Sequence, residues 1–196
     1  QYGGATVGMV RLLSELDPEE FDITAAAVAE TQEGVVRELP DCVTFKRLGI
    51  SNKLSLHQLS PLVKVLRDTD ILVCSAFHAS AVGVPLGKVL NIAIILVWRH
   101  NTNYQNGFRE FVYRIVYASS DMVLADSEAV QSMLTTEFGF PMKKITVLPI
   151  AGIDIAQFSP PDEAKQHSSP SDRIEVVTIG RLVEQKGYFD LLECAK

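Results

Sequence analysis

Apolar runs alternate with amphipathic segments along most of the chain. From Gly4 onward, apolar residues recur at helical spacing until Asp17-Pro18, where we predict that the first helix ends. Later apolar runs have the length and composition of buried parallel strands, at residues 23–28, 43–45, 71–74, 92–97, 122–125, 145–148 and 174–179. Helical patterns lie between most of these runs, at residues 55–67, 79–86, 108–119 and 127–138.

This alternation predicts an α/β fold with a Rossmann-like, doubly wound parallel sheet. In such sheets, ligands bind outside the carboxyl ends of the strands. Residues 159–172 are rich in Ser, Pro and Asp and lack apolar periodicity, so we interpret them as a linker. The sequence therefore predicts an N-terminal domain over residues 1–158 and the start of a second Rossmann-like domain over residues 173–196.

Both ends of the chain indicate a piece of a longer protein. The first helix follows Gly3-Gly4-Ala5 with no strand ahead of it, and the chain stops at Lys196, about two turns into a predicted helix. We expect the first strand of the N-terminal domain to be missing and the second domain to be truncated.

Composition excludes several classes of protein. Of the 196 residues, 47% are apolar, which is enough for a packed core, and the net charge of -6 argues against a nucleic-acid surface. The 3 cysteines contain no CxxC pair, so neither a zinc site nor a disulfide framework is indicated and a reduced, cytoplasmic setting fits best. The longest apolar run, residues 92–98 with Val89 and Leu90 just before it, is too short to span a bilayer. Peripheral contact with a membrane stays open.

The turn after residues 174–179 gathers positive charge at the start of a helix. It carries Arg181 and Lys186, with Gly180 before them and Gly187 after them. Backbone N–H groups at a helix start attract phosphate, and glycine lets the backbone approach a ligand closely. The Arg181 guanidinium and the Lys186 ammonium would then bind a diphosphate from two sides. The alternative is that these two residues are surface charges that lie near each other by chance. We predict the nucleotide end of a substrate at this turn.

Two further strand ends carry candidate residues. His100 follows the most apolar run, so it should emerge at a carboxyl end of the sheet, either as a functional group or as a structural loop histidine. His78 lies at a similar strand exit among smaller apolar neighbours. Gly3 and Gly4 open the first helix, where they either contact a ligand or form only a turn.

The helix predicted from residue 127 has two alternative roles for its first residues. Asp126 or Ser127 should cap the helix. Ser127 and Glu128 are also candidates for binding an acceptor, because a helix start offers free amides to an anionic group.

The helix predicted at residues 108–119 is aromatic and mildly basic. An apolar stripe at residues 108, 111, 112, 115 and 116 is what a core-facing helix needs, and we favour that interpretation over contact with a membrane surface.

Several motifs together resemble a known family, the retaining glycosyltransferases of the GT-B fold, family 4, also called group 1. The residues that carry the resemblance are K-I-T-V-L-P-I at 144–150, G-I-D at 152–154, F-S-P at 158–160, G-R-L at 180–182 and K-G at 186–187. The resemblance implies that the first domain binds the acceptor and that the second binds a nucleotide-sugar donor. It also implies transfer of a hexosyl group with retained anomeric configuration, without a bound metal or other cofactor.

The resemblance also implies roles for individual residues. Arg181 and Lys186 would bind the donor diphosphate and stabilise the charge that grows on it, Gly3, Gly4 and Gly180 would line that part of the cleft, and His100 would lie near the donor sugar. The sequence departs from the family pattern at Val73 and Ser75, where His residues are common. The family's carboxylate motif E-x7-E falls beyond Lys196, so this chain alone is predicted to be inactive. A sugar-nucleotide epimerase and a non-catalytic binding protein of the same fold remain alternatives.

Overall fold

A computed structural model describes residues 4–28, 33–50, 56–102, 106–149, 176–180, 182–183 and 186–194. The chain divides into two compact units, Gln1–Ile153 and Asp154–Lys196. The predicted linker at residues 159–172 lies outside the described residues, so the domain boundary stays a prediction.

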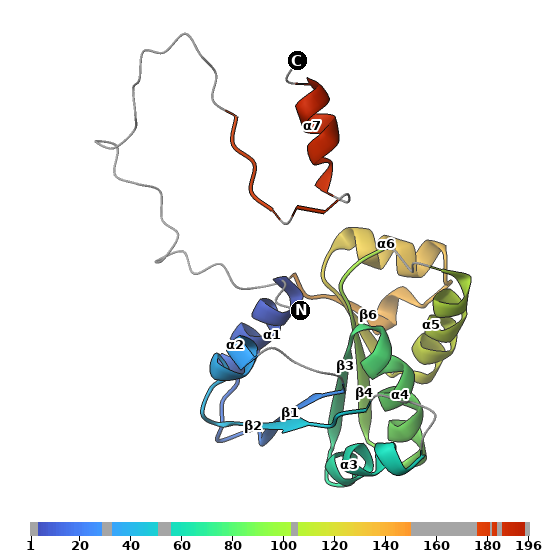
Figure 1. The fold of residues 1–196 in the computed structure, drawn as a ribbon. Coiled ribbons are helices and arrows are strands. Elements are labelled where there is room, and N and C mark those ends of the chain that lie inside the picture. Colours follow the sequence, from blue (N-terminus) through green and yellow to red (C-terminus); the bar gives the residue numbers. More distant parts are fainter. Residues whose placement is uncertain are drawn as a thin grey trace. The chain divides into compact units, whose positions relative to one another are not determined.

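The first unit alternates helices and strands, and its α/β class is as predicted (Figure 1). Its elements are α1 Gly4–Ser14, β1 Ile23–Ala27, α2 Glu33–Arg37, β2 Val43–Arg47, α3 Leu56–Leu66, β3 Ile71–Ser75, α4 Ala76–Val89, β4 Ile94–Arg99, α5 Gly107–Ser119, β5 Met122–Ala125, α6 Glu128–Thr136, the 3₁₀ turn η1 Met142–Lys144 and β6 Ile145–Val147. The short helix α2 was not predicted, because its five residues are too few to show a helical period.

All strand pairs in the described residues are parallel, but they form two sheets. One sheet pairs β1 with β2, and the other has the order β3-β4-β5-β6. The sequential order places the carboxyl ends of β3, β4 and β5 side by side at one edge. The polar residues that follow these strands are therefore neighbours in space.

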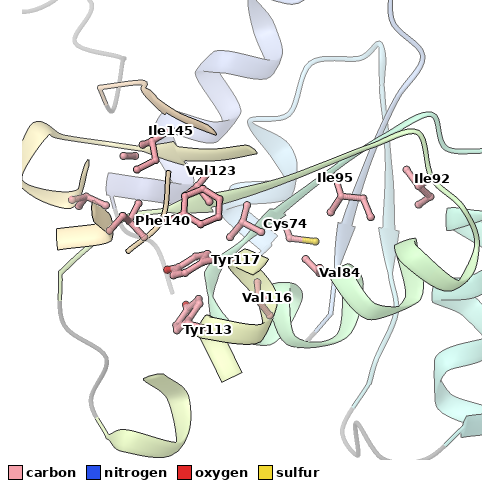
Figure 2. Packing of buried hydrophobic residues seen from close by; sticks show 14 of the residues in the cluster. Cys74, Val84, Ile92, Ile95, Tyr113, Val116, Tyr117, Val123, Phe140 and Ile145 are labelled. Carbon is pink, nitrogen blue, oxygen red and sulfur yellow. The ribbon is translucent and has the colours of Figure 1, made fainter. Parts of the chain in front are cut away.

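One face of the four-stranded sheet carries the core. Cys74, Val97, Val123 and Ile145 occupy matching positions on neighbouring strands and are all buried. Helix α4 packs against β3 and β4 and also contacts α5. Figure 2 shows Cys74 and Ile95 of the sheet beside Val84 of α4. The alternate positions of the strands, which include Ser75 and Trp98, point to the opposite face of the sheet.

Glycines allow α4 to lie close to the sheet. A Cβ atom at Gly83 would lie 2.6 Å from the Sγ atom of Cys74, and one at Gly87 would lie 2.9 Å from Cδ1 of Ile95. Real Cβ atoms do not approach other atoms so closely, so a larger residue would push α4 away from β3 and β4. The positions of β3 and of the residue that follows Cys74 therefore depend on these glycines.

The buried face of α5 differs from the predicted stripe. The helix buries Tyr113, Val116 and Tyr117, whereas Phe108, Phe111 and Ile115 are exposed. Tyr113 and Tyr117 stack on each other with ring centroids 5.3 Å apart, and Tyr117 packs edge-on against Phe138. The prediction was right for Val116 and for Val112, which packs against the core, and wrong for the three exposed residues. It counted apolar side chains alone, while tyrosine rings fill much of the core here.

The second unit contains the helix α7, Tyr188–Cys194, which starts directly after Gly187. The strand predicted at residues 174–179 is not formed over residues 176–179, and its first two residues lie outside the described residues. A strand needs a hydrogen-bonded neighbour, and the described part of this unit provides no second strand.

Candidate functional site at the carboxyl edge of the sheet

A chain of hydrogen bonds joins the ends of three adjacent strands. Ser75 is the last residue of β3, His100 follows β4 directly, and Asp126 follows β5 directly. The Oγ atom of Ser75 lies 2.7 Å from Nε2 of His100, and Nδ1 of the same ring lies 3.2 Å from Oδ2 of Asp126. Both ring nitrogens of His100 are thus bound by side chains of neighbouring strands.

The turn between β3 and α4 directs Ser75 toward His100. Ser75 occupies the N-cap position of α4, yet its side chain makes no capping hydrogen bond. An N-cap hydroxyl contributes about 1 kcal/mol to a helix, so the bond to His100 replaces a stabilising one. The next residue, Ala76, has a φ of 67°, a left-handed conformation that is strained for alanine. Buried Ser80 supports this turn by donating to the Ala76 carbonyl oxygen at 2.8 Å.

The capping alternatives after β5 are resolved in favour of Ser127. The Ser127 Oγ atom accepts a hydrogen bond from the backbone N–H of Val130 at 3.3 Å, so Ser127 is the N-cap of α6. Asp126 is left to face His100, and only 5% of its side chain is exposed. Glu128 lies in the first turn of α6 and is exposed, where its charge is favourable at the positive end of the helix dipole.

His100 is held in its neutral form. Burial lowers the pKa of His100, Asp126 opposes this by its charge and hydrogen bond, and the neighbouring charge of Arg99 lowers it further. In a neutral ring, one nitrogen donates and the other accepts. We assign the proton to Nδ1, which faces a carboxylate, so that Nε2 accepts a hydrogen bond from the Ser75 hydroxyl.

Two buried polar atoms at or beside the hydrogen-bonded side chains of Ser75, His100 and Asp126 lack a hydrogen-bond partner among the described residues. They are Oδ1 of Asp126, an acceptor, and Nε1 of Trp98, a donor. The Trp98 ring lies next to the imidazole of His100, with centroids 5.0 Å apart. Buried polar atoms are normally paired, so two unsatisfied ones next to the His100 imidazole are unusual.

Sequence reasoning found His100 but missed Ser75 and Asp126 as its partners. Ser75 was noted only as a departure from the family pattern, and Asp126 only as a capping candidate. Their positions in the sequence could have revealed them. Ser75 and Asp126 each directly follow a predicted apolar strand, and these strands lie on either side of β4 in the sheet. His78 lies in the first turn of α4, where its ring contacts Phe77.

The structure describes only some of the residues predicted to bind the diphosphate. Gly3 and Arg181 lie outside the described residues. Gly4 is the first residue of α1 and is exposed, with open space around the position of a Cβ atom. The structure therefore requires no glycine at position 4 for steric reasons.

Gly180 and Lys186 are brought together in the second unit. A Cβ atom at Gly180 would lie 3.8 Å from Cδ and Cε of Lys186 and 2.9 Å from the hydroxyl oxygen of Tyr188. Gly187 has a φ of 63°, which favours glycine, and Leu191 donates its N–H to the Gly187 carbonyl at 3.0 Å. The lysine aliphatic chain thus passes close to the backbone at Gly180, next to the start of α7.

A hollow of about 340 Å³ lies elsewhere on the first unit. Its lining includes Arg114, Phe138 and Lys144. Residues 138–144 precede β6, so the hollow is at the amino edge of the sheet, opposite the edge where ligands of such folds bind. Within the described ranges, no group of 3 or more His, Cys, Asp or Glu side chains is placed to bind a metal ion.

Similarity to known proteins agrees with this geometry. Residues 2–157 match the protein family described as Glycosyltransferase Family 4. The chain belongs to this family. Its candidate site is thus the carboxyl edge of a family 4 glycosyltransferase sheet. No curated protein matches the chain significantly.

A solved structure with the same fold is the crystal structure of Alr3699/HepE from Anabaena in complex with UDP. The two structures superpose with a TM-score of 0.61 at 14% sequence identity, over 81% of this chain and 43% of that one. The chain therefore spans less than half the length of HepE, and at this identity the likeness concerns the fold.

Proposed function

We propose that the protein transfers a hexosyl group from a nucleotide-diphosphate sugar to an acceptor, with retention of anomeric configuration and without a bound metal. Membership of the chain in glycosyltransferase family 4 over residues 2–157 is the observation that carries this proposal. The carboxyl edge with Ser75, His100 and Asp126 supports it, because buried polar groups at such an edge suit a hydroxyl-rich ligand.

The donor end of the site is proposed at the turn in the second unit. HepE was crystallised with UDP, a nucleotide diphosphate, which supports a donor of that kind. In this proposal, Arg181 and Lys186 bind the diphosphate and stabilise the charge that grows on it as the sugar leaves, and Gly180, Gly3 and Gly4 are further residues that contact the donor. The proposal puts His100 near the transferred sugar and assigns acceptor binding to Ser127 and Glu128, which are both exposed.

The acceptor is proposed to be a glycan, a lipid-linked saccharide or a small metabolite, reached at the cytoplasmic face of a membrane. Phe108, Phe111 and Ile115 form an exposed apolar face on α5, and Arg109 and Arg114 lie on the same helix. Such a face suits peripheral contact with an anionic surface. None of the described helices has the length and apolar character needed to cross a bilayer.

Nucleotide release from a panel of nucleotide sugars tests the transferase proposal. The experiment uses the complete protein, including any residues before Gln1 and after Lys196. Arg181→Ala should raise the KM for the donor about 10- to 100-fold, since a charge-assisted hydrogen bond contributes about 1.5 to 3 kcal/mol. The matched control is Arg67→Ala, which removes an exposed arginine from the first unit. Equal KM values for the wild type and Arg181→Ala would contradict the proposed donor site.

The same experiment separates the alternative functions. A sugar-nucleotide epimerase would convert the donor into an isomer without releasing the nucleotide. A non-catalytic binding protein would bind the donor and leave it intact.

A further inference from the structure

Both nitrogens of the His100 ring are committed to side chains of the protein. Ser75 at the end of β3 contacts Nε2 at 2.7 Å, and Asp126 at the end of β5 contacts Nδ1 at 3.2 Å. The ring is thus fixed from both neighbouring strands, and it cannot rotate without losing both contacts. Its exposed fraction is 13%, so one part of the ring remains open to a ligand.

One partner of His100 lies at a helix N-cap and the other lies directly before one. Ser75 is the N-cap residue of α4 but leaves the helix without a side-chain cap. Asp126 directly precedes Ser127, which caps α6. Two side chains that could satisfy local helix ends therefore face the same imidazole instead. Helix formation alone does not account for this convergence.

We propose that Asp126 is the positioning residue for His100 in the transfer reaction: it fixes the proton on Nδ1, while Ser75 holds Nε2 as the acceptor nitrogen. The inference rests on the proposed function, because it assigns His100 a role in that reaction. A carboxylate accepts hydrogen bonds and donates none, so the nitrogen that faces it carries the proton. The remaining oxygen of Asp126, Oδ1, is buried and has no hydrogen-bond partner in the described part of the chain.

Replacement of Asp126 by Asn should change the tautomer of the His100 ring while it keeps the shape of the side chain at position 126. The Asn amide group can donate to Nδ1, which moves the ring proton to Nε2, and Ser75 must then accept that proton instead of donating its own. In serine proteases, a comparable Asp-to-Asn change leaves the geometry intact and lowers turnover through the wrong tautomer.

The tautomer is read by ¹⁵N NMR of histidine side chains in the complete protein. The shift of each ring nitrogen distinguishes a protonated from an unprotonated atom, and the signal missing in His100→Gln assigns the residue. We expect protonated Nδ1 in the wild type and protonated Nε2 in Asp126→Asn. The matched control is Asp121→Asn, which makes the same change at the other end of β5 and should keep the wild-type tautomer. A wild-type ring protonated on Nε2, or an unchanged tautomer in Asp126→Asn, would overturn the inference.

Turnover separates positioning from a purely structural contact. Asp126→Asn should lower kcat about 10- to 100-fold with little change in the KM for the donor, as is typical when the partner that orients a reacting group is lost. Asp121→Asn should retain the wild-type kcat. A changed tautomer with unchanged kcat would show that Asp126 has only a structural role. A wild-type protein that releases no nucleotide from any donor would refute the proposed function itself, whereas the NMR result is independent of turnover.

Discussion

Strand β5 carries an aspartate at each end, and the two have opposite surroundings. Asp121 precedes the strand, with 44% of its side chain exposed, and it accepts a hydrogen bond from the backbone N–H of Ile95 at 2.8 Å. It also pairs with Lys88 at 3.3 Å. Asp126 follows the strand, is 5% exposed, and contacts the His100 side chain. The Asp121 carboxylate therefore interacts with a backbone N–H group and an exposed lysine, whereas the Asp126 carboxylate interacts with the largely buried ring of His100.

This difference distinguishes the amino edge of the sheet from the carboxyl edge, where we propose the functional site. At the amino edge, Asp121 bonds β5 to β4, and its own N–H donates to the Ile95 carbonyl at 2.9 Å. At the carboxyl edge, Ser75, His100 and Asp126 bond mainly to one another, and the strained residue Ala76 lies beside them. Strain and incompletely paired buried atoms are concentrated at functional sites, so the two edges should respond differently to mutation.

The largest expected effect is that of removing the imidazole. His100→Ala should lower kcat about 100-fold, in the range that a positioned polar group contributes to a reaction. Nucleotide release under donor saturation measures it. Thermal unfolding of the same variant provides the control, because a loss of turnover that merely follows global unfolding would leave the functional edge without support.

The packing below the carboxyl edge is sensitive to a single methyl group. Gly83→Ala places a Cβ atom 2.6 Å from the Sγ atom of Cys74, the residue before Ser75. Overpacking of this kind exceeds the gain in helix propensity, and the free energy of unfolding should fall by about 1 to 2 kcal/mol. Urea unfolding measures the change. Gly107→Ala, in open space at the start of α5, should leave stability unchanged or slightly raised, and equal effects of the two variants would refute the close packing of α4.

Sequence patterns predicted the alternation of elements well, because buried parallel strands are continuous apolar runs. They also placed His100 correctly after β4, since a polar residue that follows such a run emerges at the carboxyl edge. They predicted the buried face of α5 only in part, at Val112 and Val116, because Tyr113 and Tyr117 are amphipathic and their burial depends on tertiary packing. The partners of His100 were equally out of reach, since Ser75 and Asp126 are 25 and 26 positions away and meet it only through strand order.

A smaller effect is expected at the amino edge. The backbone hydrogen bond to Ile95 lowers the pKa of Asp121 below its usual 3.8, with help from Lys88 and Lys144. The ionised form therefore stabilises the fold at pH values above 3.8, and this contribution is lost as the pH falls through the lowered pKa. Asp121→Asn should lower the free energy of unfolding at pH 7 by about 1 kcal/mol, because the carboxylate is well exposed to solvent.

Urea unfolding at pH 7 and pH 3 tests Asp121. The difference between Asp121→Asn and the wild type should shrink at the lower pH. A difference of the same size at both pH values would show that the charge of Asp121 does not contribute.

The smallest effect concerns the protonation of His100. Its pKa in the folded protein is lowered from 6.5, so the unfolded chain binds a proton first as the pH falls. Stability should therefore decrease as the pH falls from 6.5 toward the lowered pKa, and remain level above 6.5 as far as this residue is concerned. His100→Gln should flatten the profile measured by urea unfolding between pH 5 and pH 8, by about a few tenths of a kcal/mol. An identical slope in both proteins would mean that His100 titrates normally.

Hydrogen exchange in the complete protein tests the functional assignment of the carboxyl edge most directly. Amide exchange is followed by mass spectrometry with and without a nucleotide sugar and an acceptor. We predict slower exchange in residues 75–80, 100–102 and 126–130, which follow β3, β4 and β5, and no change in residues 138–144 at the amino edge. Protection confined to residues 138–144, beside Arg114 and Lys144, would contradict the assignment.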